Sequence, residues 1–283
     1  MIRFVHISDT HLGASAEKEV CERNTARYFR ALVKYLGTLP FVPAFVVHTG
    51  DVANDREAEA LILAREIVSK LALPVFFVAG NHDESALMWK YLAPPARDVL
   101  RSQSGSFTYS FERDGETFVV LDGSGGREID PNGLVRSSDL GFLEECLSKS
   151  TRASVFTHFP LFAYDCPWAD TTMPILNGAE VHSVLARHSQ KIRGVFHGHM
   201  HRSSHCIRDG ILYSCVASVF CQFTAWPVEH EPQNDHTESL RFNVVTLSDS
   251  GTLVKEFSAD LKGTPTCEYG ATHIRSLILL RRM

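Results

Sequence analysis

The sequence predicts a mixed α/β fold in which two mixed β-sheets pack face to face as a sandwich flanked by helices. Three observations lead to this class. The first part of the chain alternates strand-like runs with helical patterns, which is typical of a largely parallel sheet. The last part, from His205 onward, consists mainly of short strands and turns. In addition, five apolar runs each end in Asp, Asn or His.

The alternating region begins with the run Phe4–His11. Apolar residues at helical spacing predict a helix over Glu17–Leu36 and a second one near Glu57–Leu71. Strands are predicted between and after these helices, at Phe45–His48 and Val75–Val78. This order of elements favours parallel strands covered by helices.

The middle of the chain predicts a hairpin, with strands Ser106–Phe111 and Glu116–Leu121 around the turn signal Asp114–Gly115. A helix capped by Ser137 or Ser138 is expected next. The remaining expected elements are strand Ala153–Thr157, an irregular segment Pro160–Pro174, helix Ala179–His188, and strands Gly194–His197, Cys206–Arg208, Ile211–Cys215, Leu240–Leu247 and Thr252–Phe257. We expect one domain over residues 1–283.

Composition narrows the class of protein. The chain has 283 residues, 44% of them apolar and 22% charged, as in an ordinary globular enzyme. The net charge of −5, with 28 basic against 33 acidic residues, argues against nucleic acid as a partner. No apolar run approaches the roughly 20 residues that span a bilayer. An odd set of seven cysteines without CxxC spacing, and no leader pattern, favour a cytoplasmic location.

The five strand-like runs share one design: apolar residues followed by a metal-competent side chain. Their sequences are FVHISDTH, FVVHTGD, VFFVAGNHD, ASVFTH and GVFHGHMH, starting at residues 4, 45, 75, 153 and 194. In open α/β sheets, ligands bind beyond the carboxyl ends of the strands. The candidate metal ligands at these ends are Asp9, His11, Asp51, Asn81, His158, His199 and His201.

These side chains suit two metal ions better than one. Carboxylate, imidazole and amide oxygen together favour Mn, Fe, Zn or Co, and the lack of thiolate argues against a structural zinc site. Seven ligands are too many for one ion with an open position. Two ions about 3.5–4 Å apart could hold a hydroxide and clamp a phosphoryl group. His199 and His201 would face opposite ways on a strand, but on a loop each could reach a different ion.

The same residues resemble the signature of the calcineurin-like metallophosphoesterase superfamily. The motifs that carry the resemblance are Asp9-Thr10-His11, Gly50-Asp51, Gly80-Asn81-His82-Asp83, His158 and Gly198-His199-Met200-His201, which together span about residues 5–201. The size and the form of these motifs are most similar to the class III branch, which contains cyclic-nucleotide and glycerophosphodiester phosphodiesterases. The resemblance implies a metallophosphoesterase fold.

The resemblance also implies roles for the residues. Asp9, His11 and His201 would bind the first metal, Asn81, His158 and His199 the second, and Asp51 would bridge both. His82 would face the phosphate as the catalytic acid that protonates the leaving alkoxide. A hydroxide between the metals would attack in line, without a covalent enzyme intermediate.

One position departs from the family pattern. Many members have an Asp three residues after the bridging Asp to orient the catalytic histidine, whereas this chain has Asn54, followed by Asp55. We expect the Asn54 amide to hold the imidazole, with weaker support for imidazolium than a carboxylate would give. Asp83 is expected to have a structural role. Together with Asn54, it would position the metal-binding residues without binding metal itself.

Other polar and aromatic residues are expected to have structural roles. His6, His48 and His197 would be buried beside the site, and Asp122 would tie a loop. The aromatic residues of the loops 160–174 and 220–238 either pack locally or form a lid that stacks a nucleobase. The histidines expected at the surface are His188, His205, His230, His236 and His273.

The sequence therefore predicts a phosphodiesterase acting on a small soluble diester, a cyclic nucleotide such as cAMP or a glycerophosphodiester. The alternatives are a phosphomonoesterase or nucleotide pyrophosphatase on the same site, and a non-catalytic scaffold with this fold. A homodimer is a candidate assembly, with the tail 264–283 as the candidate contact. A nuclease is disfavoured by the acidic balance of charge.

Overall fold

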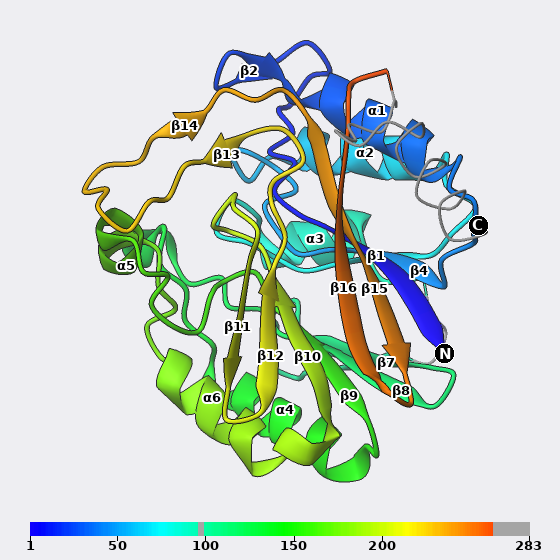
Figure 1. Ribbon diagram of the computed structural model, residues 1–283, viewed down its shortest axis with the longest axis vertical. Helices are drawn as coiled ribbons and strands as arrows, with labels where there is room; N and C mark the ends of the chain where they lie inside the picture. Colours follow the sequence, from blue (N-terminus) through cyan, green and yellow to red (C-terminus); the bar gives the residue numbers. More distant parts are fainter. Residues whose placement is uncertain (96–98, 263–283) are drawn as a thin grey trace, which may run out of the picture.

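Two large sheets stand face to face in the computed structural model, which describes residues 1–95 and 99–262 (Figure 1). The first sheet has the strand order β16-β15-β1-β4-β5. Its central strands β1 (Ile2–Ile7), β4 (Phe45–His48) and β5 (Val75–Phe77) are parallel. The C-terminal hairpin of β15 (Leu240–Ser248) and β16 (Gly251–Ala259) joins β1 antiparallel. Residues far apart in the chain thus complete one sheet.

The second sheet has the order β11-β12-β10-β9-β8-β7-β6. Its strands β12, β10, β9 and β8 are parallel to one another. At one end β11 joins β12 antiparallel, and at the other end β7 joins β8 and β6 joins β7, each antiparallel to its neighbour. The bounds are β6 Leu100–Arg101, β7 Tyr109–Arg113, β8 Glu116–Val120, β9 Ala153–Phe156, β10 Ile192–His197, β11 Ser204–Arg208 and β12 Ile211–Cys215. The predicted class of two mixed sheets with flanking helices is confirmed.

Helices cover the outer faces of both sheets. Those near the first sheet are α1 (Thr25–Leu36), α2 (Ala58–Val68) and α3 (Ser85–Tyr91). Leu143 and Leu147 of α4 (Ser137–Lys149) and Val181 and Leu185 of α6 (Gly178–Arg187) pack on the second. The smaller elements are α5 Pro167–Thr172, η1 Arg127–Ile129, η2 Ser189–Lys191 and the two-residue strands β2 Glu19–Val20, β3 Arg23–Asn24, β13 Gln222–Phe223 and β14 Asn234–Asp235.

A layer of phenylalanine rings fills the space between the sheets. Seven strands each contribute one ring: Phe4, Phe45 and Phe76 from the first sheet, and Phe111, Phe118, Phe156 and Phe196 from the second. Phe118 lies 5.0 Å from Phe45 and 6.2 Å from Phe4, and Phe76 stacks on Phe111 across the interface at 3.7 Å. Stacked and edge-on aromatic contacts of this kind add to the burial of apolar area and hold the sheets at a defined distance.

The helix predicted over Glu17–Leu36 is wrong in its first part. Residues 19–24 form the small hairpin β2–β3, because Cys21 and Glu22 have φ of 50° and 61°, which a right-handed helix excludes. The helix begins only after Asn24, whose side chain accepts a hydrogen bond from the Arg27 amide at 2.7 Å. Periodicity alone could not reveal this cap, because Val20 fits the apolar stripe by coincidence.

Smaller differences concern caps and loops. Ser137 and Ser138 lie inside α4, whose N-cap is Arg136 and makes no side-chain capping bond, so the expected serine cap is wrong. Part of the segment 160–174 is helical, as α5, and the loop 220–238 contains β13 and β14. The strands expected along the chain all overlap observed strands. The expected tail contact at 264–283 and His273 lie outside the described residues.

We predict that Phe118→Ala lowers the free energy of unfolding by about 3–5 kcal/mol, because a fully buried ring that touches four other phenylalanines is removed. Urea denaturation followed by circular dichroism measures the change. Phe257→Ala is the matched control: its ring is 39% exposed, so a loss below about 1.5 kcal/mol is expected. Equal losses for both variants would contradict the importance assigned to the aromatic layer.

Candidate metal centre

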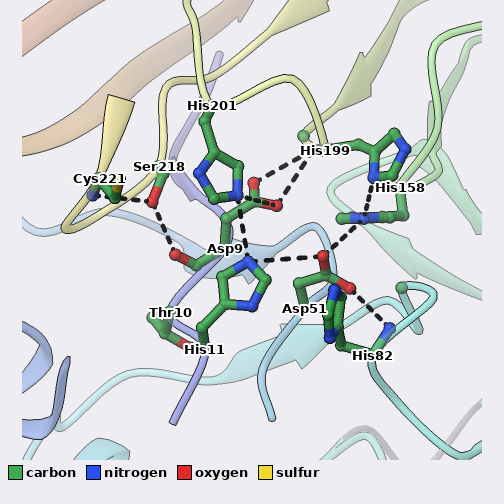
Figure 2. A network of polar contacts seen from close by, with 12 residues as sticks. Asp9, Thr10, His11, Asp51, His82, His158, His199, His201, Ser218 and Cys221 are labelled. Atoms are coloured by element: carbon green, nitrogen blue, oxygen red, sulfur yellow. Dashed lines mark hydrogen bonds and ion pairs between the residues drawn. The ribbon is translucent and has the colours of Figure 1, made fainter. Parts of the chain in front are cut away.

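The seven predicted ligands lie at the carboxyl ends of five strands, at one edge of the sandwich. Asp9 and His11 follow β1, Asp51 follows β4, and Asn81 follows β5. From the second sheet, His158 follows β9, and His199 and His201 follow β10. All seven side chains are buried. Figure 2 shows the side chains pointing toward one another for Asp9, His11, Asp51, His158, His199 and His201. Both sheets therefore contribute to one cluster.

Five of these residues have a left-handed backbone, which is uncommon for residues other than glycine. The φ angles are 57° at Asp9, 42° at His11, 54° at Asp51, 69° at His199 and 47° at His201. Such turns let residues two apart in sequence direct their side chains into the same space, which a straight strand forbids. Non-glycine residues in this region persist only where their surroundings hold them, and they gather at functional sites.

The glycine of three motifs permits the segments to approach each other. A Cβ atom at Gly50 would lie 2.5 Å from Nδ1 of His158, and one at Gly80 would lie 2.2 Å from Oδ1 of Asp51. At Gly198, a Cβ atom would meet the Ser8 hydroxyl at 1.9 Å. Each of these distances is far below van der Waals contact, so any side chain would push the strand ends apart.

Six of the ligands form two groups of three: one contains Asp9, His11 and His201, and the other contains Asp51, His158 and His199. In the first, His201 Nε2 lies 3.4 Å from Asp9 Oδ1 and 3.1 Å from His11 Nε2. In the second, His158 Nε2 lies 3.2 Å from Asp51 Oδ2 and 3.0 Å from His199 Nδ1. The candidate ligand atoms within each group of three all lie within 4.8 Å of one another.

Asp51 Oδ2 lies between the imidazoles of the two groups. It is 3.5 Å from His11 Nε2 in the first group and 3.2 Å from His158 Nε2 in the second. Asp51 Oδ1 accepts a hydrogen bond from the main-chain amide of His82 at 3.0 Å, which holds the carboxylate in this orientation (Figure 2). Asn81 lies between Gly80 and His82, both of which contact Asp51.

The charges of the site favour cation binding. Burial alone would raise the pKa of Asp9, but attraction to His201 outweighs it and keeps the pKa below its usual range. Burial is likewise outweighed at Asp51, mainly by His158 and His82, so that its pKa is also low. Burial lowers the pKa of His11 to about 3, and burial also lowers that of His199 well below its usual value. Ionised carboxylates and neutral imidazoles are the forms that bind metal.

The donor set and its unpaired amide oxygen fit a pair of metal ions. Within the described residues, Asn81 Oδ1 is buried without a hydrogen-bond partner, while His199 Nδ1 and His201 Nε2 contact other ligand side chains of the cluster. A buried polar atom without a partner is costly unless a cation or water satisfies it. Nitrogen and oxygen donors without thiolate suit Mn, Fe, Zn or Co. The part each residue plays in binding metal stays a prediction.

His82, the predicted acid, lies beside the cluster and is held by the main chain. Its Nδ1 donates to the carbonyl oxygen of Asn54 at 2.6 Å, and its ring centre is 4.8 Å from that of His11. The expectation that the Asn54 amide holds the imidazole is wrong, because the backbone carbonyl does so whatever the side chain at position 54. Burial would lower the pKa of His82, but Asp51 and the Asn54 carbonyl outweigh it and raise the pKa.

Asp83 links the turn that carries Asp51 to its own turn through hydrogen bonds to main-chain amides. Its carboxylate accepts hydrogen bonds from the amides of Val52, Ala53 and Gly80 at 3.2, 2.9 and 3.0 Å. Three such bonds tie the turn after β4 to the turn after β5. The structural role expected for Asp83 agrees with these contacts. Asp122 similarly ties its loop, accepting from the amides of Phe107 and Ser124.

The three histidines expected to be structural are buried near the site. His6 Nε2 lies 2.9 Å from the hydroxyl of Thr49, and His48 Nε2 lies 2.9 Å from that of Thr10. His197 is also buried, at the end of β10. Burial lowers the pKa of His48 and of His197 to about 4, so these imidazoles are neutral. Of the histidines expected at the surface, His188 is only partly exposed and contacts Glu144.

Aromatic residues of the loop 220–238, together with Phe159, pack against the ligands. The Phe223 ring stacks on His201 at 4.9 Å, and Phe220 lies 5.7 Å from His11. On the other side of the cluster, Phe159 is 4.8 Å from His199. The sequence left open whether the loop aromatics pack locally or form a lid over a nucleobase. These three rings pack locally against the imidazoles and keep them in place. Trp226, by contrast, is 63% exposed.

Sequence reasoning missed three polar residues. Ser218 donates from its hydroxyl to the Asp9 carbonyl at 2.8 Å and so supports the first motif (Figure 2). Arg56 donates to the carbonyl of Asn81, and His182 bridges Tyr213 and Asp209 away from the site. No motif surrounds any of them. Their roles depend on contacts with residues distant in the chain, which one sequence does not reveal.

Comparison with known proteins identifies the family. Residues 2–203 match the family model of the calcineurin-like phosphoesterases. The chain belongs to this family. It is thus a metal-dependent phosphoesterase of a family that binds a dinuclear metal centre. No helix in residues 1–95 and 99–262 has the length and apolar character required to cross a membrane.

Several relatives are named as diesterases. The chain is 24% identical over 226 residues to the 3',5'-cyclic adenosine monophosphate phosphodiesterase CpdA of Haemophilus influenzae, covering 79% of this chain and 78% of that protein. It is 27% identical over 201 residues to the glycerophosphodiester phosphodiesterase GpdQ of Enterobacter lignolyticus, covering 69% of each. The expected resemblance to the class III branch is confirmed by these relatives.

Solved structures share the fold. A dimetal phosphatase from Danio rerio superposes with a TM-score of 0.62 at 19% identity, covering 90% of this chain and 95% of that one. A purple acid phosphatase from yellow lupin gives a TM-score of 0.55 at 11% identity, covering 92% of this chain and 51% of that one. At these identities the likeness concerns the fold alone.

We predict that Mn²⁺ binding to the metal-free protein at pH 7 releases about one proton from His158. Burial would lower the pKa of this imidazole, but Asp51 outweighs it and raises the pKa to about 9, so a proton must leave before the nitrogen can bind metal. Titration calorimetry in HEPES and in Tris measures the release, because the apparent enthalpy then depends on the buffer.

The raised pKa of His158 also predicts how the stability of the metal-free protein changes with pH. The raised pKa stabilises the metal-free fold fully below about pH 6.5, and this contribution is lost as the pH rises toward 9. Metal affinity should change in the opposite sense and increase over this range. A binding enthalpy that is the same in both buffers would contradict the protonated state assigned to His158.

Proposed function

We propose that this protein is a binuclear-metal phosphodiesterase that hydrolyses a small phosphodiester, a cyclic nucleotide such as cAMP or, second, a glycerophosphodiester. The observation that carries the proposal is the position of Asp51 Oδ2, within 3.5 Å of one imidazole from each ligand group, with His82 alongside. The names of the relatives support the diester class.

In this proposal Asp9, His11 and His201 bind one ion, and Asn81, His158 and His199 bind the other. Asp51 contributes to both. When bound, two such ions supply an activated water and neutralise charge on the phosphoryl oxygens. The mixed nitrogen and oxygen donors support Mn, Fe, Zn or Co as the metals.

His82 has the geometry of a general acid. Because its Nδ1 donates to the Asn54 carbonyl, the ring is fixed and Nε2 is the nitrogen left to meet the substrate. Its raised pKa favours the protonated form near neutral pH. We propose that Nε2 gives its proton to the alkoxide oxygen that leaves phosphorus.

The arginines around the site favour a diester over a monoester. Arg23 donates to the carbonyl of Phe220, Arg56 to that of Asn81, and Arg202 to that of Phe223. Arg56 and Arg202 also pair with Asp130 and Asp235. A doubly charged monoester would gain from a cationic side chain turned toward it, whereas each of these guanidinium groups already donates to a main-chain carbonyl.

The cysteines support a reducing compartment, and we propose a cytoplasmic location. Cys21, Cys146, Cys166, Cys206, Cys215 and Cys221 are free thiols in the described residues. Free thiols of this number are typical of proteins kept reduced in the cell interior.

The test of the proposed function compares bis-p-nitrophenyl phosphate with p-nitrophenyl phosphate in the presence of Mn²⁺. We expect faster turnover of the diester, together with hydrolysis of cAMP or of a glycerophosphodiester. Asp51→Asn should reduce every activity to background, because the proposed bridging ligand loses its charge. Faster cleavage of the monoester would favour a phosphomonoesterase, and preference for a dinucleotide pyrophosphate would favour a pyrophosphatase. No turnover with two bound ions would favour a scaffold.

A second prediction concerns His82→Ala. Loss of a general acid should lower kcat for cAMP by about 10²–10⁴-fold, because the ribose alkoxide is a poor leaving group. The loss should be much smaller for bis-p-nitrophenyl phosphate, whose leaving group needs no proton. His205→Ala is the control, since His205 is an exposed histidine paired with Glu256. Full activity on cAMP in a metal-loaded His82→Ala variant would refute the assigned role.

A further inference from the structure

The turn at residues 54–56 holds the segment that carries Asn81 and His82. The main-chain amide of Arg56 donates to the His82 carbonyl at 3.0 Å. The guanidinium of Arg56 donates to the Asn81 carbonyl through Nε at 2.9 Å and Nη2 at 2.6 Å. One residue therefore binds both carbonyl oxygens of the dipeptide that contains a proposed metal ligand and the proposed acid.

Arg56 adopts a backbone conformation that is disfavoured for residues with a Cβ atom. Its φ is 55°, in the left-handed region where glycine is the unstrained choice. Such a conformation persists only when the surrounding contacts hold it. The contacts here are the hydrogen bonds to the two carbonyls, and the Arg56 side chain is only 9% exposed.

Asp130 balances the charge of this guanidinium. Both oxygens of Asp130 lie 2.8 Å from Nη2 of Arg56. Asp130 comes directly after η1, in a segment well separated from the metal-binding motifs in sequence. A buried cation without such a partner would be costly, so the pair allows Arg56 to stay beneath the 81–82 turn.

We propose that Arg56, neutralised by Asp130, is a positioning residue for the second metal site. By binding the main-chain carbonyl of Asn81, the Arg56 guanidinium orients this residue so that its side-chain oxygen, Oδ1, can bind the ion. The main-chain amide of Arg56 fixes the carbonyl of His82. The planar guanidinium of arginine lets Nε and Nη2 donate together to one oxygen, which the single ammonium of lysine cannot reproduce. The inference rests on the proposed function, since it assigns Asn81 to a metal.

Arg56→Gly isolates the side chain. Glycine tolerates the positive φ and keeps the hydrogen bond from the main-chain amide of residue 56 to the His82 carbonyl. Only the arginine side chain is lost. Arg56→Lys keeps the charge without the fork, and Asp130→Asn removes the partner charge. Arg152→Ala is the matched control, because Arg152 forms an exposed ion pair with Asp249.

The readout is Mn²⁺ binding measured by calorimetry without substrate, together with steady-state kinetics. We expect Arg56→Gly to keep the ion held by Asp9, His11 and His201. The affinity for the second ion should fall about ten- to a hundredfold, as for other residues that orient a ligand. The value of kcat should fall with little change in KM at saturating metal. Millimolar guanidinium ion should recover part of both losses in Arg56→Gly, and Arg56→Lys should be intermediate.

Two outcomes would overturn the inference. One is wild-type affinity for both ions with wild-type kcat in Arg56→Gly. The other is equal weakening of both ions without rescue by guanidinium, which would mean a general structural role. If Arg56→Gly does not fold, Asp130→Asn and Arg56→Lys decide by the same criterion. Failure of the proposed function would appear separately, as a wild-type protein that binds two ions yet does not cleave diesters.

Discussion

The contact between the two sheets through seven phenylalanine rings is the interaction on which the rest of the structure depends. Each ring comes from a different strand, so the layer sets the separation and the alignment of the sheets together. The alignment matters because the carboxyl ends of β1, β4 and β5 then face those of β9 and β10 at one edge (Figure 1). Asp9, His11, Asp51 and Asn81 belong to one sheet and the other three ligands to the second, so neither sheet holds the site alone.

Close packing at this edge explains the local backbone. Glycines 50, 80 and 198 remove the side chains that would separate the turns, and five ligands take left-handed conformations to reach the common space. These features are unfavourable for the isolated segments. They are compensated by a network in which Asp83, Ser218 and Arg56 bind main-chain groups of the turns. The strained turns and the network therefore form one unit, and the stable sandwich supports it.

Much of the fold and the site could be predicted from the chain by itself, because strands and their polar ends are local patterns. All expected strands overlap observed ones, six of the seven expected ligands approach one another in two groups of three, and Asn81 is buried. The errors fall where a local pattern competes with backbone geometry. The apolar stripe that includes Val20 extends past the true start of α1, because Cys21 and Glu22 turn the chain and Asn24 caps the helix. The support of His82 by a carbonyl instead of an amide could not be foreseen, since residue type does not reveal which backbone atoms meet.

The amino-acid sequence by itself determined the class of fold, the strand ends that carry carboxylate, amide and imidazole, and the family to which these motifs point. It did so because alternation of apolar residues and short motifs are properties of neighbouring positions. Only the tertiary structure decided that Asp51 lies between two groups of imidazoles, that phenylalanines from both sheets interlock, and that Arg56 and Asp130 meet beneath Asn81. These arrangements join residues from 25 to more than 100 positions apart, and their geometry depends on how the whole chain packs.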